Sequence, residues 1–429
     1  MRLSSLFFVL AIGGSLVSAK TDDPPFFYTC DELTPDLCEL KVEEGQVEIR
    51  GINVSYWKYT SSDAPSNHSI PIVALHGGPS FSHHYMLPLK QQACRGRPIY
   101  FYDQAGCGSS VPSKNFSAAR DHPWLLDPGY YATEELPALL KHWQLKRFHL
   151  VGNSWGTMLA QLYALDASET DGLASMVLSG PFSDSQSYIR AQWGDDEDDG
   201  TLGGLPPFIQ QRIQTLEAQH AYESPEYEAL DNIMTGFFTL RTEPAPDCWL
   251  TANAQTNMEI YVAMQGPSEF TMSGVLEHTN VTGRLHEITV PVLLSHGRYD
   301  TMRPSIVKTM QELLPYAERL YLNRSGHASM IDEPGPMNDG IADFLDRVEE
   351  STFGAFNLTT GFAPKKDIDS EDDVDHYDED DCEDIVNDAI RPRHPFLLLL
   401  PLVAIALMIG YIFGYRSAQQ KYAQYTAIG

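Results

Sequence analysis

The chain has 429 residues, of which 43% are hydrophobic, so it is long and apolar enough to bury a large core. Its formal net charge is −29, a sign that argues against binding to nucleic-acid phosphates. The composition therefore excludes a wholly disordered chain and disfavours a nucleic-acid-binding protein, and it indicates a globular protein with attached segments.

Residues 1–19 have the features of a signal peptide. Arg2 precedes an apolar stretch, and Val17 and Ala19 have the small-residue spacing that signal peptidase accepts. The alternative is a buried N-terminal strand or helix. We expect the chain to enter the secretory pathway, with residues 20–44 as an N-terminal extension. Six asparagines begin N-x-S/T sequons and are candidates for glycosylation: Asn53, Asn67, Asn115, Asn280, Asn323 and Asn357.

Short apolar runs alternate with helical stretches between residues 45 and 349. The pattern predicts strands within 69–78, 97–104, 147–154, 173–180 and 290–300, and helices within 133–143 and 155–166. Continuous apolar strands that alternate with helices indicate an α/β fold, with a mostly parallel sheet covered on both faces. Functional groups should then collect at the carboxyl ends of the strands.

Residues 184–284 interrupt this alternation. They are rich in Gln, Glu, Pro and aromatic residues, and the run "DDEDD" occupies 195–199. We expect a mainly helical insertion that covers the strand ends as a cap. It divides the core into a first segment, 45–183, and a second segment, 285–349.

The stretch "LVGNSWGTMLAQ", residues 150–161, contains a G-x-S-x-G pattern formed by Gly152, Ser154 and Gly156. A β-prone run precedes it and good helix formers follow it, as at a nucleophile elbow, where glycines permit a sharp turn that exposes the serine hydroxyl. The alternative is a small residue at an ordinary strand-to-helix turn. Because three fixed positions also match by chance, the assignment of Ser154 as nucleophile depends on its partners.

Two candidate partners follow predicted strands. Asp300 ends "LLSHGRYD", and His327 stands in "LYLNRSGHASM". The order Ser, Asp, His is that of α/β-hydrolases. A serine hydroxyl needs a neutral imidazole to take its proton, and a buried carboxylate fixes the imidazole tautomer. The alternatives are a helix-capping aspartate and a surface histidine. Each is common by itself, but they do not explain why both residues follow predicted strands in this order.

The segment "LHGGPSFSHH" follows another predicted strand. Gly77 and Gly78 can leave a backbone N–H exposed that joins the N–H of Trp155 in an oxyanion hole. An ordinary tight turn is the alternative. Serine at position 154 favours acyl transfer, since epoxide or haloalkane chemistry would need aspartate there.

The C-terminal region predicts a stalk, a membrane anchor and a tail. Residues 367–384 contain 12 carboxylates and no Lys or Arg, so we expect 350–394 to be a solvated, disordered stalk. A Ca²⁺ site is the alternative, but the spacing is not that of an EF-hand. Residues 395–415 carry no charge and are long enough to span a bilayer. A GPI signal is disfavoured because 416–429 follow the apolar run.

These features predict a single-pass type I membrane protein, with the catalytic domain in the lumen or outside the cell and 416–429 in the cytosol. The tail contains "YTAI", which resembles an endosomal sorting signal. The cell surface and the endosomal or vacuolar membrane are both compatible with it.

Six cysteines in an oxidising compartment permit disulfides. Their connectivity does not follow from the sequence, although Cys30 and Cys38 are the most plausible local pair, and Cys107 could be a buried free thiol. No two cysteines have zinc-ribbon spacing, so we expect neither a metal site nor a cofactor.

Six motifs occur in order along the chain: "HGGPS", "YFYDQAGCGSS", "GNSWGTMLA", "EIYVAMQGPSEFTMSG", "VPVLLSHGRYD" and "SGHASMIDEP". As a set they resemble the motifs of the proline iminopeptidase family of α/β-hydrolases, most closely its tricorn-interacting aminopeptidase branch and its fungal members. The resemblance covers about residues 47–349. It implies a serine peptidase that releases an N-terminal residue, often proline, from a small peptide, amide or arylamide.

The resemblance also assigns residues. It implies Ser154, Asp300 and His327 as the triad, and it implies that Glu269, in the "GP-x-EF" motif, binds the free amino group of the substrate. The tricorn-interacting branch has a second glutamate directly after the catalytic aspartate, where this chain has Thr301.

Three functions remain open at this point. The first is a membrane-anchored serine aminopeptidase or amidase. The second is an esterase or amidase for small secondary metabolites without strict recognition of a free amine. The third is a non-catalytic adhesion or receptor ectodomain, which is disfavoured because such proteins usually lose part of the triad.

Overall fold

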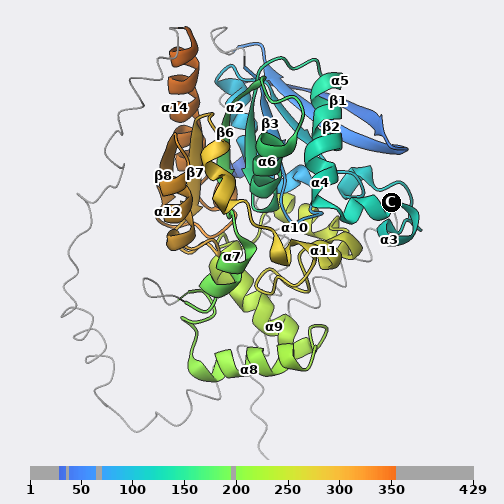
Figure 1. Cartoon of the computed structure of the whole chain (residues 1–429), viewed down its shortest axis with the longest axis vertical. Helices are drawn as coiled ribbons and strands as arrows, with labels where there is room; N and C mark the ends of the chain where they lie inside the picture. The colour runs from blue at the N-terminus through green and yellow to red at the C-terminus, as the bar shows by residue number, and fades with distance from the viewer. Residues whose placement is uncertain (1–28, 35–37, 64–69, 195–199, 354–429) are drawn as a thin grey trace, which may run out of the picture. The chain divides into compact units, whose positions relative to one another are not determined.

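The computed structural model describes residues 29–34, 38–63, 70–194 and 200–353. These residues form an eight-stranded sheet in the order β1-β2-β4-β3-β5-β6-β7-β8 (Figure 1). β1 and β2 pair antiparallel with each other, β2 pairs antiparallel with β4, and the remaining pairs are parallel. The strands are β1 (Leu40–Ile49), β2 (Ile52–Ser61), β3 (Ile72–Leu75), β4 (Ile99–Tyr102), β5 (Phe148–Asn153), β6 (Leu173–Ser179), β7 (Val292–Gly297) and β8 (Ala317–Leu322).

The five inner strands, β3 to β7, are buried along their whole length. Apolar residues occupy both faces of these strands because helices cover the sheet on both sides. The predicted mostly parallel sheet is therefore confirmed, and each of the five predicted strands is present.

Two hydrophobic clusters fill the two faces of the sheet. On β3, Val73 and Leu75 belong to one cluster, and Ile72 and Ala74 belong to the other. This division follows from the alternation of side chains along a strand. The first cluster includes residues of α5 (Leu136–His142), α6 (Trp155–Asp166) and α12 (Pro304–Leu313). The second includes residues of α2 (Gln91–Cys94), α13 (Ser329–Asp332) and α14 (Pro334–Phe353).

The sequence did not predict the hairpin of β1 and β2. β1 begins at Leu40, inside the extension that was expected to run to residue 44. It is an edge strand with mostly exposed side chains, and its sequence LKVEEGQVEI carries too many glutamates to read as a buried strand. Arg50 and Gly51 turn the chain with φ values of 50° and 84°, as in a type I′ hairpin.

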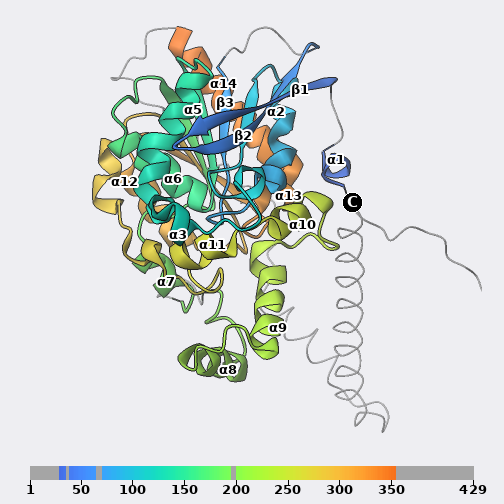
Figure 2. The same ribbon diagram turned by 90° about the vertical axis from the view of Figure 1, so that its right-hand side faces the viewer.

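The segment between β6 and β7 is mainly helical in its described residues. A small hydrophobic cluster of its own includes Ile213, Tyr227 and Phe270. In both views α8 and α9 lie beyond α7 and α11, away from the sheet (Figures 1 and 2). Its elements are α7 (Ser185–Ala191), α8 (Pro207–Ala218), α9 (Pro225–Met234), the π-helical turn η5 (Thr235–Thr239), α10 (Asp247–Ala254), α11 (Met258–Met264), η6 (Val275–His278) and η7 (Thr282–Glu287). We call this segment the cap.

Two disulfides connect distant parts of the chain. Cys30 of α1 (Cys30–Leu33) is joined to Cys248 of α10, and Cys38 is joined to Cys94. The predicted pairing of Cys30 with Cys38 is therefore wrong, because the folded chain brings a nearer partner to each thiol. Cys107 is buried and free.

Replacing both Cys30 and Cys248 with alanine should lower the free energy of unfolding by about 2–5 kcal/mol, the usual effect of losing a native disulfide. The bond joins residues 218 positions apart, against 56 for Cys38 and Cys94. The chain-entropy model therefore predicts a loss smaller by roughly 1 kcal/mol when Cys38 and Cys94 are replaced. Urea unfolding of the two double variants measures both values, and an unchanged midpoint for the Cys30 and Cys248 variant would contradict this expectation.

Several predicted segments lie outside the described residues: the signal peptide (1–19), most of the stalk, the membrane span (395–415) and the tail (416–429). α14 continues to Phe353, past the core boundary expected at residue 349. Among the described helices, none has the length and apolar character that crossing a membrane requires.

Candidate active site

Ser154 occupies a strained turn between β5 and α6. Its φ and ψ are 57° and −126°, and it is 8% exposed. Glycine is required on both sides of this turn because neither position has space for a side chain. A Cβ on Gly156 would lie 2.0 Å from the Leu75 carbonyl oxygen, and one on Gly152 would lie 2.3 Å from that of Gly156. The turn therefore has the strained geometry of a nucleophile elbow.

Asp300 and His327 come together from the loops that follow β7 and β8. The His327 ring donates from Nδ1 to Asp300 Oδ1 at 2.7 Å, and the Met302 N–H donates to the same oxygen at 2.8 Å. Asp300 is 1% exposed and His327 is 5% exposed. Since Nδ1 carries the proton of this bond, Nε2 is the nitrogen that remains for proton transfer.

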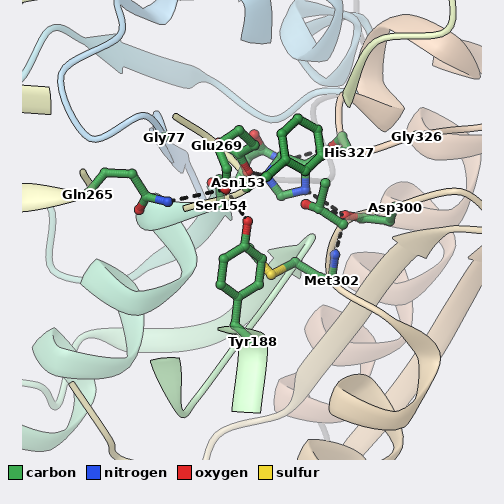
Figure 3. A network of polar contacts seen from close by, with 12 residues as sticks. Gly77, Asn153, Ser154, Tyr188, Gln265, Glu269, Asp300, Met302, Gly326 and His327 are labelled. Carbon is green, nitrogen blue, oxygen red and sulfur yellow. Dashed lines mark hydrogen bonds and ion pairs between the residues drawn. The ribbon is translucent and has the colours of Figure 1, made fainter. Parts of the chain in front are cut away.

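The free nitrogen of His327 faces Glu269. Nε2 lies 3.9 Å from Glu269 Oε1 and forms no hydrogen bond to any described residue, Ser154 included (Figure 3). Burial alone would lower the pKa of His327, but the charge and hydrogen bond of Asp300, together with the charge of Glu269, raise it to about 9.

Glu269 lies in the cap between α11 and η6, and its side chain is 17% exposed. Its backbone carbonyl accepts hydrogen bonds from the Tyr188 hydroxyl and from Gln265 Nε2 (Figure 3). Burial raises the pKa of Glu269 to about 7; the charge of His327 opposes this rise, and the charge of Asp300 adds to it. The hydroxyl of the fully buried Thr301 lowers the pKa of the Glu269 carboxyl, and it donates a 3.5 Å hydrogen bond to Asp300 Oδ1. Thr301, which directly follows the triad aspartate, therefore also influences the Glu269 carboxyl.

A buried chain of hydrogen bonds positions the loops around Ser154. The Gly77 N–H donates to Tyr85 Oη at 2.7 Å, and this hydroxyl donates to Asn153 Oδ1 at 2.9 Å. Asn153 Nδ2 then donates to the carbonyls of Ser179 and His327. Asn153, which directly precedes Ser154, thus connects the elbow with the loop that carries the histidine.

This hydrogen-bond network corrects the prediction that the Gly77 N–H donates to an oxyanion. This amide is occupied by Tyr85, so it is not free to stabilise an oxyanion. Glycine is required there because a Cβ would lie 2.8 Å from the Cβ of Ser154. The Trp155 N–H, by contrast, stands at the first position of α6, where a helix offers no carbonyl partner. Gly78, with φ of 119°, and Trp155 remain as candidate oxyanion donors.

The cap holds the histidine loop through backbone hydrogen bonds. The N–H of His327 donates to the carbonyl of Phe238 at 2.9 Å, and the N–H of Ala328 donates to that of Thr239 at 2.8 Å. The Asp332 carboxylate accepts from the Gly326 N–H and from the Arg241 N–H. The position of His327 therefore depends on the cap as well as on β8.

Gly180, directly after β6, is a site residue that the sequence did not reveal. It has φ of +58°, and a Cβ there would lie 2.5 Å from both Nδ1 and Cε1 of His327. The motif "LSGP" gives no sign of this contact, because the residues that meet are far apart in the chain.

Gly180→Ala should reduce kcat by roughly 10²-fold or more, since a shift of about 1 Å in a catalytic group can have this effect. Alanine at positive φ also costs about 1–2 kcal/mol, so the variant's unfolding must be measured beside its activity. Gly51→Ala, which adds a methyl group at φ of +84° with no atom within 4 Å, is the matched control for backbone strain. Equal activity in the two variants would contradict the contact with His327.

Comparison with known proteins identifies the family. Residues 72–339 match the Alpha/beta hydrolase family. The chain is 32% identical over 307 residues to a protein of Heyndrickxia coagulans named proline iminopeptidase, an alignment that covers 71% of this chain and 99% of that one. The chain belongs to the proline iminopeptidase family of α/β-hydrolases. It is accordingly a serine hydrolase, and the resemblance seen in its motifs is confirmed.

A second relative and a solved structure are also similar to this chain. A proline iminopeptidase of Flavobacterium johnsoniae is 31% identical over 289 residues, which cover 66% of this chain and 92% of the relative. The crystal structure of proline iminopeptidase from Mycobacterium smegmatis has a TM-score of 0.64 at 24% identity and covers 72% of this chain and all of that one. At this identity the structural match shows the fold alone.

Proposed function

We propose that this family member is a membrane-anchored serine aminopeptidase. It releases an N-terminal residue, proline or another small or apolar residue, from short peptides, amides or arylamides. The names of its relatives support the class of substrate, and the geometry around Ser154 supports the reaction.

Catalysis proceeds through an acyl-enzyme. His327 Nε2 takes the proton of Ser154 as its hydroxyl attacks the substrate carbonyl, and it then passes this proton to the leaving amine. Asp300 holds the imidazole tautomer through the 2.7 Å bond to Nδ1. The N–H groups of Gly78 and Trp155 stabilise the developing oxyanion. A water molecule, activated by His327, then releases the acyl group.

The proposal of an aminopeptidase rests on the distance of 3.9 Å between Glu269 Oε1 and His327 Nε2. In a substrate's N-terminal residue, the α-ammonium and the carbonyl are attached to the same Cα. A carboxylate this close to the catalytic histidine can therefore bind the α-ammonium only of the residue whose carbonyl is attacked. A substrate with a blocked amine brings no cation to this mostly buried carboxylate and therefore gains no charge-assisted hydrogen bond there. The arrangement thus favours an aminopeptidase over an endopeptidase.

An esterase or amidase for small metabolites is the second candidate. The observation that favours it is Thr301, which places a neutral hydroxyl where the tricorn-interacting branch has a second glutamate. Amine recognition would then be weaker and simple esters would be good substrates.

One assay separates the two candidates. The whole chain is tested with prolyl and alanyl arylamides, their N-acetylated forms and short-chain esters. The aminopeptidase proposal expects the free-amine arylamides to be hydrolysed and the acetylated forms to be nearly inert. Equal rates on free and acetylated arylamides, or hydrolysis of esters only, would favour the esterase.

We propose further that the catalytic domain lies on the lumenal or extracellular side, anchored through residues 395–415. The leader and the apolar span in the sequence support this topology, as do the two disulfides among the described residues. The sequon asparagines within the described residues, Asn53, Asn115, Asn280 and Asn323, are all exposed; Asn67 and Asn357 lie outside them.

Two measurements test this topology. Glycosidase treatment should shift the protein on a gel, and an antibody to residues 416–429 should bind cells only after permeabilisation. Binding of that antibody to intact cells would reverse the topology, and an unchanged gel position would argue that the leader is not used.

A further inference from the structure

The general base of the empty site is paired with a carboxylate and not with the nucleophile. His327 Nε2 lies 3.9 Å from Glu269 Oε1, has no hydrogen bond to Ser154 and is shielded from solvent. A negative charge at this distance stabilises the imidazolium, which cannot accept the proton of Ser154. The contact with Glu269 thus opposes the first step of the reaction.

The substrate supplies a competing cation. An α-ammonium that binds Glu269 neutralises the charge that holds the imidazolium, and it occupies the oxygen atoms that face Nε2. We propose that Glu269 keeps His327 protonated while the site is empty, and that the α-ammonium of a substrate releases His327 to act as a base. This inference rests on the amine-binding role of Glu269 in the proposed function.

The proton balance of this step is simple. Before binding, Glu269 carries a negative charge and His327 a positive one. On binding, the substrate ammonium takes the place of the imidazolium beside Glu269, and the Nε2 proton passes to water. One proton is therefore released for each substrate bound. The net charge inside the site is unchanged, because the ammonium that enters replaces the charge of the proton that leaves.

The consequence concerns specificity. A ligand without an amine, such as a simple ester, enters a site whose base is still protonated, so it reacts slowly even when it fits. The enzyme thereby selects free amines through the protonation of His327 as well as through binding.

The pair is ionised on the alkaline side of neutral pH. The pKa of His327 is raised to about 9 and that of Glu269 to about 7, so both are charged between these values. Below about pH 7 Glu269 loses its charge, and above about pH 9 His327 loses its proton. The groups that face the pair are Asp300 after β7, Thr301 beside it, Asp231 of α9, Tyr188 of α7, Tyr261 of α11 and Tyr85.

The test is the pH profile of kcat/KM for an acetate ester, which reports the pKa of the base in the free enzyme. In Glu269→Gln the acid limb should move down by at least about one pH unit, so hydrolysis of the ester near pH 8 should rise by roughly five- to tenfold. Above about pH 10 the two enzymes should agree. The same variant should lose activity on prolyl arylamide.

Glu226→Gln is the matched control. It makes the same chemical change in the cap, at an exposed carboxylate that pairs with Arg212 on the surface. Its ester profile should coincide with that of the wild-type chain. A shift of equal size in Glu226→Gln would overturn the proposal, since it would make the effect one of overall charge.

Proton release on ligand binding is a second test, and it uses the wild-type chain without any measurement of activity. Pyrrolidine carries an ammonium and cannot react, so its binding to the wild-type chain near pH 8 should release a proton, measured with a pH indicator. Binding without proton release would overturn the inference.

The failures of the two proposals are distinguishable. If Glu269→Gln loses prolyl arylamide activity but its ester profile stays in place, Glu269 binds the amine and the release of His327 is refuted. If neither substrate is affected, the amine-binding role fails and this inference fails with it.

Discussion

Ser154→Ala should lower kcat by about 10⁴- to 10⁶-fold on every substrate, the range for loss of a triad nucleophile. The Ser154 hydroxyl forms no hydrogen bond among the described residues, so alanine removes the nucleophile and almost no packing. Alanine and serine are strained to a similar extent at φ of 57°, and the fold should therefore be retained. Activity on a prolyl arylamide, measured beside thermal unfolding, checks both expectations.

Ser183→Ala is the control for this variant. Its hydroxyl pairs with that of Thr282 at 2.8 Å in a partly buried contact. Activity should stay within a few-fold of the wild-type value. If Ser154→Ala kept substantial activity with an intact fold, the nucleophile would have to be another residue.

Glu269→Gln should reduce kcat/KM for free-amine substrates by roughly 10- to 150-fold. A charge-assisted hydrogen bond to the α-ammonium is worth about 1.5–3 kcal/mol, and this energy corresponds to that range. Glutamine keeps the shape and removes the charge. Rates on an acetate ester, compared above about pH 10 where His327 is neutral in both enzymes, should be nearly equal.

The outcomes on the two substrates separate the roles of Glu269. Equal loss on arylamide and ester would mean that Glu269 supports the fold of the cap. Loss on neither would mean that the carboxylate has no role in recognition. Thr301→Glu adds a second charge beside the first, and it should increase the preference for a free over an acetylated amine if the site is otherwise intact.

The inner sheet and the relation of Asp300 to His327 could be predicted from the sequence because both depend on local patterns. β3 to β7 are short apolar runs that end in, or are closely followed by, Gly, Asn, Asp or Ser, and such runs indicate buried parallel strands. The carboxyl ends of parallel strands meet at one edge of a sheet, so residues that follow β7 and β8 come close together. The 2.7 Å bond between Asp300 and His327 is the result.

The remaining features depend on the path of the whole chain. Cys30 and Cys248 are 218 residues apart, and no local pattern predicts their pairing. Tyr85 looks like any core aromatic, yet its hydroxyl occupies the amide of Gly77. Gly180 reads as a loop glycine, yet it lies against the ring of His327. Each role arises from contacts between segments that the sequence does not place side by side.

The proximity of Thr301 to Glu269 is another feature that the sequence alone does not show. Thr301 follows Asp300 in the chain and Glu269 lies in the cap, so only the fold brings the Thr301 hydroxyl near enough to lower the pKa of the Glu269 carboxyl.

Covalent labelling by a prolyl diphenyl phosphonate, a serine-directed reagent with a free amine, tests Ser154 and amine recognition together when it is followed by peptide mass spectrometry. We predict a single adduct, on Ser154, that forms at least about tenfold faster than with the N-acetylated reagent, in line with one charge-assisted hydrogen bond. An adduct on another residue would contradict the assignment of the nucleophile, and equal labelling rates for the two reagents would contradict recognition of the amine.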